Sequence, residues 1–258
     1  MRSPHGRLRT PIRVTVGAFA LVTGMIAVAG CSTGSAEAPA PRAPADLLLP
    51  TSDLPPGFTA ETLSIDDLVA GNRAGIDAAH TTRVSPEYCA PTADAELNGR
   101  LTADNTAVLA ARGGNGVLVE LVTKAQRDID ADRLATTGRC ARTTTEITTG
   151  NLAGSRVVTE YTEIPPPGGD GALGAGEQML LTRSEVTTTL PDGGVRRQVG
   201  FAGYAALDRP ASGPVTVQLT VSGSATPAAD PPPEPTEPVH SAAFAELFDA
   251  AVGRVTAP

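Results

Sequence analysis

The sequence predicts an α+β domain in which helices pack on one face of an antiparallel β-sheet. Strand-like runs outnumber helical runs, and short turns join strands that follow one another along the chain. The chain ends in an amphipathic segment whose large apolar side chains recur at helical spacing, namely Phe244, Leu247, Phe248, Ala251, Val252 and Val255. We expect this C-terminal amphipathic helix to dock on the sheet.

The chain begins with a segment typical of exported proteins. Residues 1–13 carry four arginines and no acid, and residues 14–30 carry no charge. The uncharged run has 17 residues, near the lower limit of about 17–25 for a membrane-spanning helix. Residues 28–31 (VAGC) resemble the bacterial lipobox, in which the signal is cleaved before the cysteine and a diacylglyceryl group is attached to its thiol.

This resemblance implies a signal peptide at 1–30 and a lipid anchor on Cys31. The protein would then be held through this lipid at the outer face of the cytoplasmic membrane, in the cell envelope. Ordinary secretion with Cys31 as a spare thiol, or an uncleaved anchor, are the alternatives. Residues 31–45 are rich in Ala and Pro and contain no large apolar side chain, so we expect a tether there.

A single domain is predicted over residues 46–258. Its first apolar residues, Leu47–Leu49, and the turn Pro55-Pro56-Gly57 before Phe58 predict a segment that crosses the core. Apolar residues at helical spacing predict a helix over residues 64–82, although two glycines weaken it.

Two cysteines remain beyond the anchor, Cys89 and Cys140. An exported protein meets an oxidising compartment, so we expect them to form one disulfide that closes a loop of about 50 residues. A redox or metal-binding pair is the alternative, but the chain has no Cys-x-x-Cys motif and no histidine at ligand spacing beside them.

Between the cysteines the pattern predicts a hairpin and a helix. Residues 106–112 and 116–122 are strand-like and flank a glycine-rich turn. Thr123 and Gln126 have the spacing of a capping box and predict a helix that runs to about Thr137.

The second half of the domain is mostly strands. Those we expect are residues 143–149, 155–164, 177–190, 195–207 and 215–222. The last of these alternates apolar and polar residues strictly, which predicts a sheet with one buried face. Residues 165–176 are predicted to form an exposed loop, and residues 225–238 form a proline-rich extended spacer.

The composition of the chain disfavours several classes of binding partner. Removing residues 1–30 removes four arginines and no acid, which shifts the formal net charge from −8 to −12. This charge disfavours nucleic acid and anionic lipid headgroups as partners. A membrane-surface role for the last helix is disfavoured because its polar face carries only Arg254 against Glu246 and Asp249. The chain has no Trp and few other aromatic residues, which disfavours carbohydrate stacking.

Motifs for chemistry are scarce, so we expect neither an enzyme nor a bound cofactor. His80 and His240 have no ligand at metal-binding spacing, and no nucleophile elbow or phosphate-binding loop is present. Asp128–Asp132 begins like a calcium loop, but Arg133 and Arg139 occupy positions that require Gly and Glu. Paired carboxylates of a glycosidase type are not excluded, which leaves an extracytoplasmic hydrolase as an alternative.

Several features together resemble actinobacterial, mycobacterial-type cell-envelope lipoproteins of an uncharacterised family. They are the lipobox at Cys31, the runs at 47–49 and 53–58, residues 86–89 (PEYC) and the terminal helix. The layout is also distantly similar to the extracellular sensor domain of PknH-type kinases, although that domain is expected to use two disulfides.

The resemblance implies a sensor-like domain that binds a small-molecule, lipid or cell-wall ligand. An accessory protein that binds an envelope protein partner is the alternative. No site residue of either family can be assigned to a position of this sequence.

Overall fold

The computed structural model describes residues 42–114, 116–167, 176–209, 213–228 and 236–256, all within the unit Ala38–Pro258. The predicted signal peptide, Cys31 and most of the tether lie outside these residues. The same holds for the central parts of the loop at 165–176 and of the spacer at 225–238. Within the described residues, no helix combines the length and the apolarity needed to cross a bilayer.

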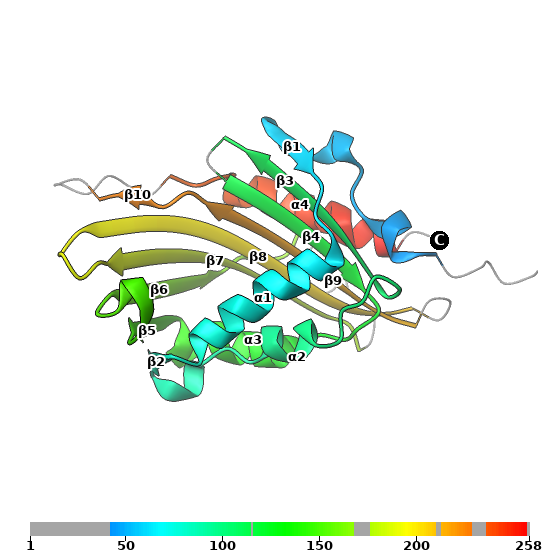
Figure 1. The fold of residues 1–258 in the computed structure, drawn as a ribbon. Coiled ribbons are helices and arrows are strands. Elements are labelled where there is room, and N and C mark those ends of the chain that lie inside the picture. Colours follow the sequence, from blue (N-terminus) through cyan, green and yellow to red (C-terminus); the bar gives the residue numbers. More distant parts are fainter. Residues whose placement is uncertain (1–41, 115, 168–175, 210–212, 229–235, 257–258) are drawn as a thin grey trace, which may run out of the picture. The chain divides into compact units, whose positions relative to one another are not determined.

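The described residues form ten strands and four α-helices (Figure 1). The strands are β1 (Phe58–Glu61), β2 (Thr82–Ser85), β3 (Thr106–Gly113), β4 (Gly116–Thr123), β5 (Arg142–Ile147), β6 (Arg156–Glu163), β7 (Gln178–Thr189), β8 (Val195–Arg209), β9 (Gly213–Gly223) and β10 (Thr226–Pro227). The α-helices are α1 (Ile65–Ala79), α2 (Ala93–Asn98), α3 (Ile129–Thr136) and α4 (Ser241–Thr256). Short 3₁₀ turns are η1 (Pro44–Leu47), η2 (Thr51–Asp53), η3 (Glu87–Cys89), η4 (Gly138–Cys140) and η5 (Gly150–Leu152).

All strands belong to one antiparallel sheet in the order β1-β3-β4-β9-β8-β7-β6-β5-β2, with β10 paired to the start of β8. Strands β5 to β9 form a meander, because each of them pairs with the next strand along the chain. A tight turn at Leu190–Gly194 joins β7 to β8. The hairpin β3–β4 joins this meander through the pairing of β4 with β9. The predicted α+β class, with an antiparallel sheet and a C-terminal helix, is therefore confirmed.

The helices divide between the two faces of the sheet, so the expectation that they share one face is wrong in this detail. Figure 1 shows α1, α2 and α3 in front of the sheet and α4 behind it. The physical reason lies in the alternation of side chains along a strand. In β4, Leu118 and Val122 join the core beneath α4, whereas Leu121 packs with the residues of α1 and α2. We name the two sides the α4 face and the α1 face.

The α4 face contains the main core. The predicted apolar stripe of α4 is buried throughout, and it lies against the alternate residues of β9 that the sequence pattern assigned to the buried face. Phe244 stacks on Phe201 of β8 with ring centroids 5.2 Å apart. A side chain at Gly203 would place its Cβ 2.6 Å from the ring of Phe248, so glycine is needed where α4 approaches β8.

The segment before β1 crosses the α4 face as predicted. Leu47 and Leu49 are buried in the main core, and the backbone N–H of Leu49 donates to Glu120 Oε2 over 2.9 Å. Arg42 donates to the carbonyl oxygen of Arg254 near the end of α4. The chain therefore enters the domain beside the end of α4.

Helix α3 begins later than the sequence predicts. Thr123 is the last residue of β4, where its hydroxyl pairs with that of Thr106, and Asp128 caps the helix by accepting from the N–H of Ala131. The apparent capping box at 123–126 fails because strand pairing with β3 and β9 extends to Thr123.

Candidate functional site

Cys89 and Cys140 form the expected disulfide. Their Cα atoms are 5.5 Å apart, both residues are buried, and the bond joins η3 to η4 at the end of α3. Lipidation of Cys31 stays a prediction because this residue lies outside the described part of the chain.

The two histidines singled out in the sequence lie at the ends of helices. His80 ends α1 and His240 precedes α4. Over the described ranges, no three His, Cys, Asp or Glu side chains gather in a way that could hold a metal ion. The acids of the segment that begins like a calcium loop belong to the cap and first turn of α3, and Asp132 binds an arginine.

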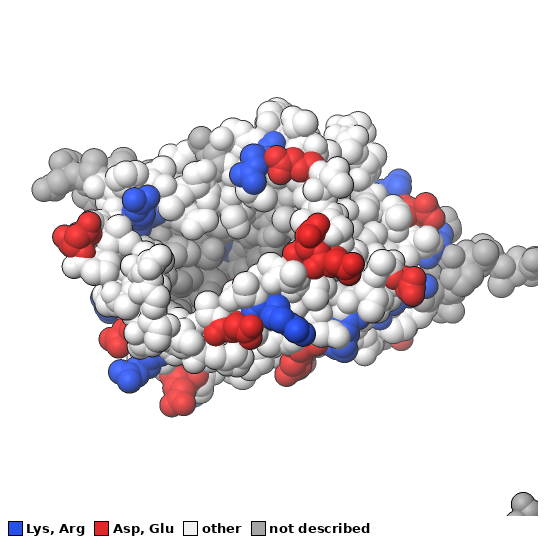
Figure 2. All heavy atoms as spheres, in the orientation of Figure 1, with Lys and Arg blue, Asp and Glu red and all other residues white. Residues whose placement is uncertain are grey.

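The α1 face of the central strands is partly open. Residues of β8 and β9 that point to the α4 face are almost fully buried, whereas Ala202 and Thr220 on the α1 face remain half-exposed. Ser184 of β7 and Gly200 of β8 are likewise half-exposed and small. Figure 2 shows that the molecule is hollowed on this face, beside α1.

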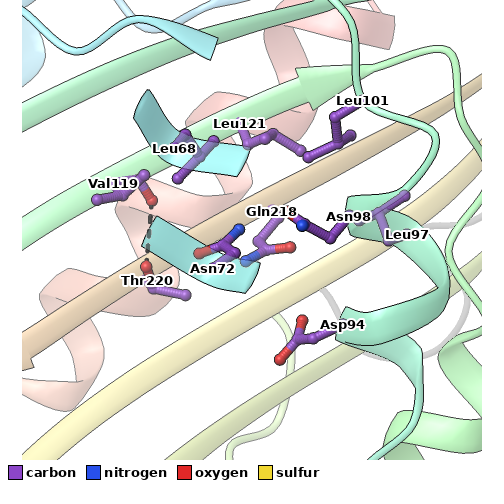
Figure 3. A pocket seen from close by; sticks show the side chains of 10 residues that line it. All are labelled: Leu68, Asn72, Asp94, Leu97, Asn98, Leu101, Val119, Leu121, Gln218 and Thr220. Carbon is purple, nitrogen blue, oxygen red and sulfur yellow. Dashed lines mark hydrogen bonds between the residues drawn. The ribbon is translucent and has the colours of Figure 1, made fainter. Parts of the chain in front are cut away.

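A pocket of about 140 Å³ lies on this face between α1, α2, β4 and β9. Its walls combine aliphatic side chains with amides, a hydroxyl and one carboxylate. The lining residues are Leu68, Asn72, Asp94, Leu97, Asn98, Leu101, Val119, Leu121, Gln218 and Thr220. We name this pocket the α1 hollow (Figure 3).

Asn98 is the most unusual of these residues. It is 5% exposed, and its amide Nδ2 donates to the carbonyl oxygen of Val69 over 3.1 Å. Its Oδ1 is buried and accepts no hydrogen bond in the described part of the protein. A buried polar atom without a partner costs about 1–3 kcal/mol, so a ligand or water that donates to this oxygen would be stabilised here.

A buried ion pair stands beside the hollow. The side chain of Arg127 is 1% exposed, and it donates to both carboxylate oxygens of Asp132, at 2.6 and 2.7 Å. It also donates to Asp94 Oδ1 at 2.7 Å and to Gln218 Oε1 at 3.1 Å. Its guanidinium carbon lies 4.0 Å from the centre of the Tyr204 ring, an arrangement that favours a cation.

The protonation states in this cluster follow from burial and charge. Burial by itself lowers the pKa of Arg127, but the hydrogen bonds that it donates to Asp132 and the charge of Asp94 outweigh this effect. The net shift of the pKa is therefore upward, and the guanidinium stays charged. Burial raises the pKa of the Tyr204 phenol well above its ordinary value, although the charge of Arg127 opposes this. Tyr204 therefore stays neutral at physiological pH.

The cluster fixes the walls of the hollow. The backbone N–H of Arg127 donates to Thr216 Oγ1, whose hydroxyl donates to the carbonyl oxygen of Ala125. Arg127 thus connects the loop after β4 with α2, α3 and β9. Sequence analysis missed Arg127 because the capping-box pattern placed it inside a helix, and it missed Gln218 because alternation assigned it to a solvent face.

A second buried carboxylate lies on the opposite face. Glu120 is fully buried under the segment that carries Leu49, and its Oε1 accepts no hydrogen bond among the described residues. Burial raises the pKa of Glu120 to about 7, although the hydrogen bond from Leu49 and the charge of Arg254 oppose the shift. One acid inside the apolar run GVLVELV was the signal for this residue in the sequence.

Comparisons with known proteins give little further information. A scan against protein-family models gave no match, and a search of curated proteins gave none. Among solved structures, one similar chain is an uncharacterised protein from Mycobacterium smegmatis, an Rv0999 ortholog. It is 15% identical, with 79% of this chain and 92% of that chain covered and a TM-score of 0.43. A likeness of this size carries no inference about function, and the similarity to kinase sensor domains stays a prediction.

Proposed function

We propose that this chain is a lipid-anchored protein of the bacterial cell envelope whose domain binds a small ligand in the α1 hollow and catalyses no reaction. The observation that carries the proposal is the buried Oδ1 of Asn98, which has no partner among the described residues, in the wall of a pocket that combines leucines with amides, a hydroxyl and a carboxylate. Pockets for small molecules combine an apolar lining with a few fixed polar groups in this way.

The path of the chain supports access to the hollow in an anchored protein. The described chain starts at residue 42 beside the end of α4, where Arg42 binds the carbonyl oxygen of Arg254. This is the α4 face, whereas the hollow opens on the α1 face. Residue 42 therefore joins the domain on the face opposite the hollow.

The chemistry of the lining supports recognition rather than catalysis. Covalent or acid–base catalysis needs a nucleophile or a proton carrier with a partner that tunes it. The side chains in the hollow are aliphatic groups, amides, one hydroxyl and the carboxylate of Asp94, which already binds Arg127. Such groups orient a ligand by hydrogen bonds and exclude water from its apolar part.

Ligand binding is tested by blocking the hollow. Thr220→Phe places a ring in the pocket, and Ser222→Phe is its control, because Ser222 is exposed on the same face of the same strand but does not line the hollow. We expect native mass spectrometry of the full chain, extracted from envelope membranes, to show a small bound mass that Thr220→Phe loses and Ser222→Phe keeps. Equal ligand-free spectra for all three proteins would contradict the proposal.

The anchor is tested separately. Cells that express the full chain are fed an alkyne fatty acid, and the wild-type protein is expected to carry the label and to sediment with membranes. Cys31→Ser is expected to lose both properties, whereas Cys89→Ser, which breaks the disulfide, should keep the label. An unlabelled wild-type protein, or a Cys31→Ser protein labelled as strongly as the wild type, would contradict lipidation at this residue.

A further inference from the structure

Negative charges outnumber positive charges in the cluster beside the α1 hollow. Arg127 is already held by both oxygens of Asp132, so this buried pair has no net charge. Asp94 adds a second carboxylate to the same arginine, and its side chain is 63% exposed on the hollow. The three groups together carry one negative charge, located on the carboxylate that a ligand can reach.

The surroundings of the hollow strengthen this negative charge. Asp66 and Asp67 stand in the first turn of α1, and Figure 2 shows acidic side chains gathered over the beginning of this helix. Two arginines are next to lining residues along the chain: Arg73 follows Asn72 on α1, and Arg100 precedes Leu101. Neither lines the hollow, and Arg100 donates to the carbonyl oxygens of Glu96 and Gln126. The potential in the hollow therefore attracts cations.

Polar and apolar side chains are separated within the hollow. In Figure 3, Leu68, Leu101 and Leu121 lie together at one end, whereas Asp94 lies at the other. Asn98 projects between them with its amide nitrogen toward Gln218, and its Oδ1, on the same amide group, is buried and has no hydrogen-bond partner among the described residues. Asp94 Oδ1 already accepts from Arg127, so Asp94 Oδ2 and Asn98 Oδ1 are the acceptors that a ligand would meet, and the complementary ligand group is a donor.

We propose that the α1 hollow binds small organic ammonium compounds, with the ammonium group at Asp94 and Asn98 and a short alkyl part against the leucines. This inference rests on the proposed function, because it names the ligand class of the same pocket. An ammonium group supplies three donors and a positive charge, which satisfies the carboxylate and the unpartnered amide oxygen together. The volume of about 140 Å³ suits a short chain, since pockets for drug-sized molecules span about 300–1,000 Å³.

The test compares three compounds of equal chain length: pentylammonium, pentan-1-ol and pentanoate. The full chain is placed in phosphatidylcholine nanodiscs, and dissociation constants are measured by ligand-observed saturation-transfer NMR against empty nanodiscs. We expect pentylammonium to bind about fivefold more tightly than pentanol, as one partly exposed ion pair allows, and pentanoate to bind more weakly than pentanol. Raising the NaCl concentration should weaken pentylammonium binding alone.

Two variants test whether the carboxylate of Asp94 is the group that binds the ammonium. Asp94→Asn should weaken pentylammonium binding about fivefold, to the level at which the wild-type protein binds pentanol. Asp77→Asn is the control, because Asp77 is an exposed carboxylate of α1 that does not line the hollow. If Asp94→Asn fails to fold because Arg127 loses a partner, the salt dependence of the wild-type protein decides the question.

The outcomes separate the two proposals. Equal or tighter binding of pentanol or pentanoate, with loss of all binding in Thr220→Phe, would overturn the preference for ammonium and leave the binding function intact. Absence of binding by all three compounds, or binding that persists in Thr220→Phe, would overturn the α1 hollow as a ligand site.

Discussion

Glu120 is expected to make the stability of the domain fall as the pH rises. Its folded pKa is about 7, against an ordinary value of 4.5, because burial disfavours the charged form. Between these values the folded protein keeps a proton that the unfolded chain releases, so the folded state binds more protons. The stabilising contribution is complete below pH 4.5 and is lost as the pH rises through 7.

The magnitude follows from the size of the shift. A shift of one pKa unit corresponds to 1.36 kcal/mol, so the full effect is about 3 kcal/mol. Most of this, roughly 2–3 kcal/mol, falls between pH 5 and pH 8. Glu120→Gln keeps an acceptor for the backbone N–H of Leu49 and removes the titration. As the pH rises from 5 to 8, the unfolding free energy of the wild type should therefore fall by this amount relative to that of the variant.

The assay is urea unfolding of the two proteins at several pH values between 5 and 8, followed by circular dichroism. Taking the difference between the proteins cancels the titration of every other group. Glu246→Gln, which removes an exposed carboxylate of α4, is the matched control and should show no such trend. A difference for Glu120→Gln that stays constant over this pH range would refute the reasoning about its burial.

Three further variants test the packing, the disulfide and the buried ion pair. Gly203→Ala should lower the unfolding free energy by about 1–3 kcal/mol, because the new methyl group overlaps the buried ring of Phe248, and urea unfolding measures it. Changing both Cys89 and Cys140 to Ala should lower the unfolding free energy by about 4 kcal/mol, which is the loop-closure value for a separation of 51 residues. An unchanged melting temperature would contradict this expectation. Asp132→Asn should lower the unfolding free energy by about 3–5 kcal/mol, because it leaves the buried Arg127 without its main carboxylate partner. A loss below 1 kcal/mol would show that Asp94 alone is enough to stabilise the buried Arg127.

Local sequence patterns predicted the elements whose packing depends on a regular period. The six apolar positions of α4 and the alternation in β9 correspond directly to buried residues, because each pattern has one buried face. The start of α3 was predicted wrongly, since strand pairing at Thr123 overrode a local capping signal. The division of helices between two faces depends on long-range pairing, which local patterns do not encode.

The candidate site could not be predicted for the same reason. Asp94, Asn98, Arg127 and Gln218 come from α2, the loop after β4 and β9, and only the fold brings them together. In the sequence, each of these four residues is an ordinary polar residue of a predicted helix, loop or strand. The unpartnered oxygen of Asn98 is a property of the packed structure and has no counterpart in the sequence.

A crystal structure of the protein purified from its own membranes tests the central claim most directly. The account predicts electron density in the α1 hollow for a group that donates a hydrogen bond to Asn98 Oδ1 and contacts the leucines at the other end. A hollow that contains ordered water alone, or that is closed by its own side chains, would contradict ligand binding at this site.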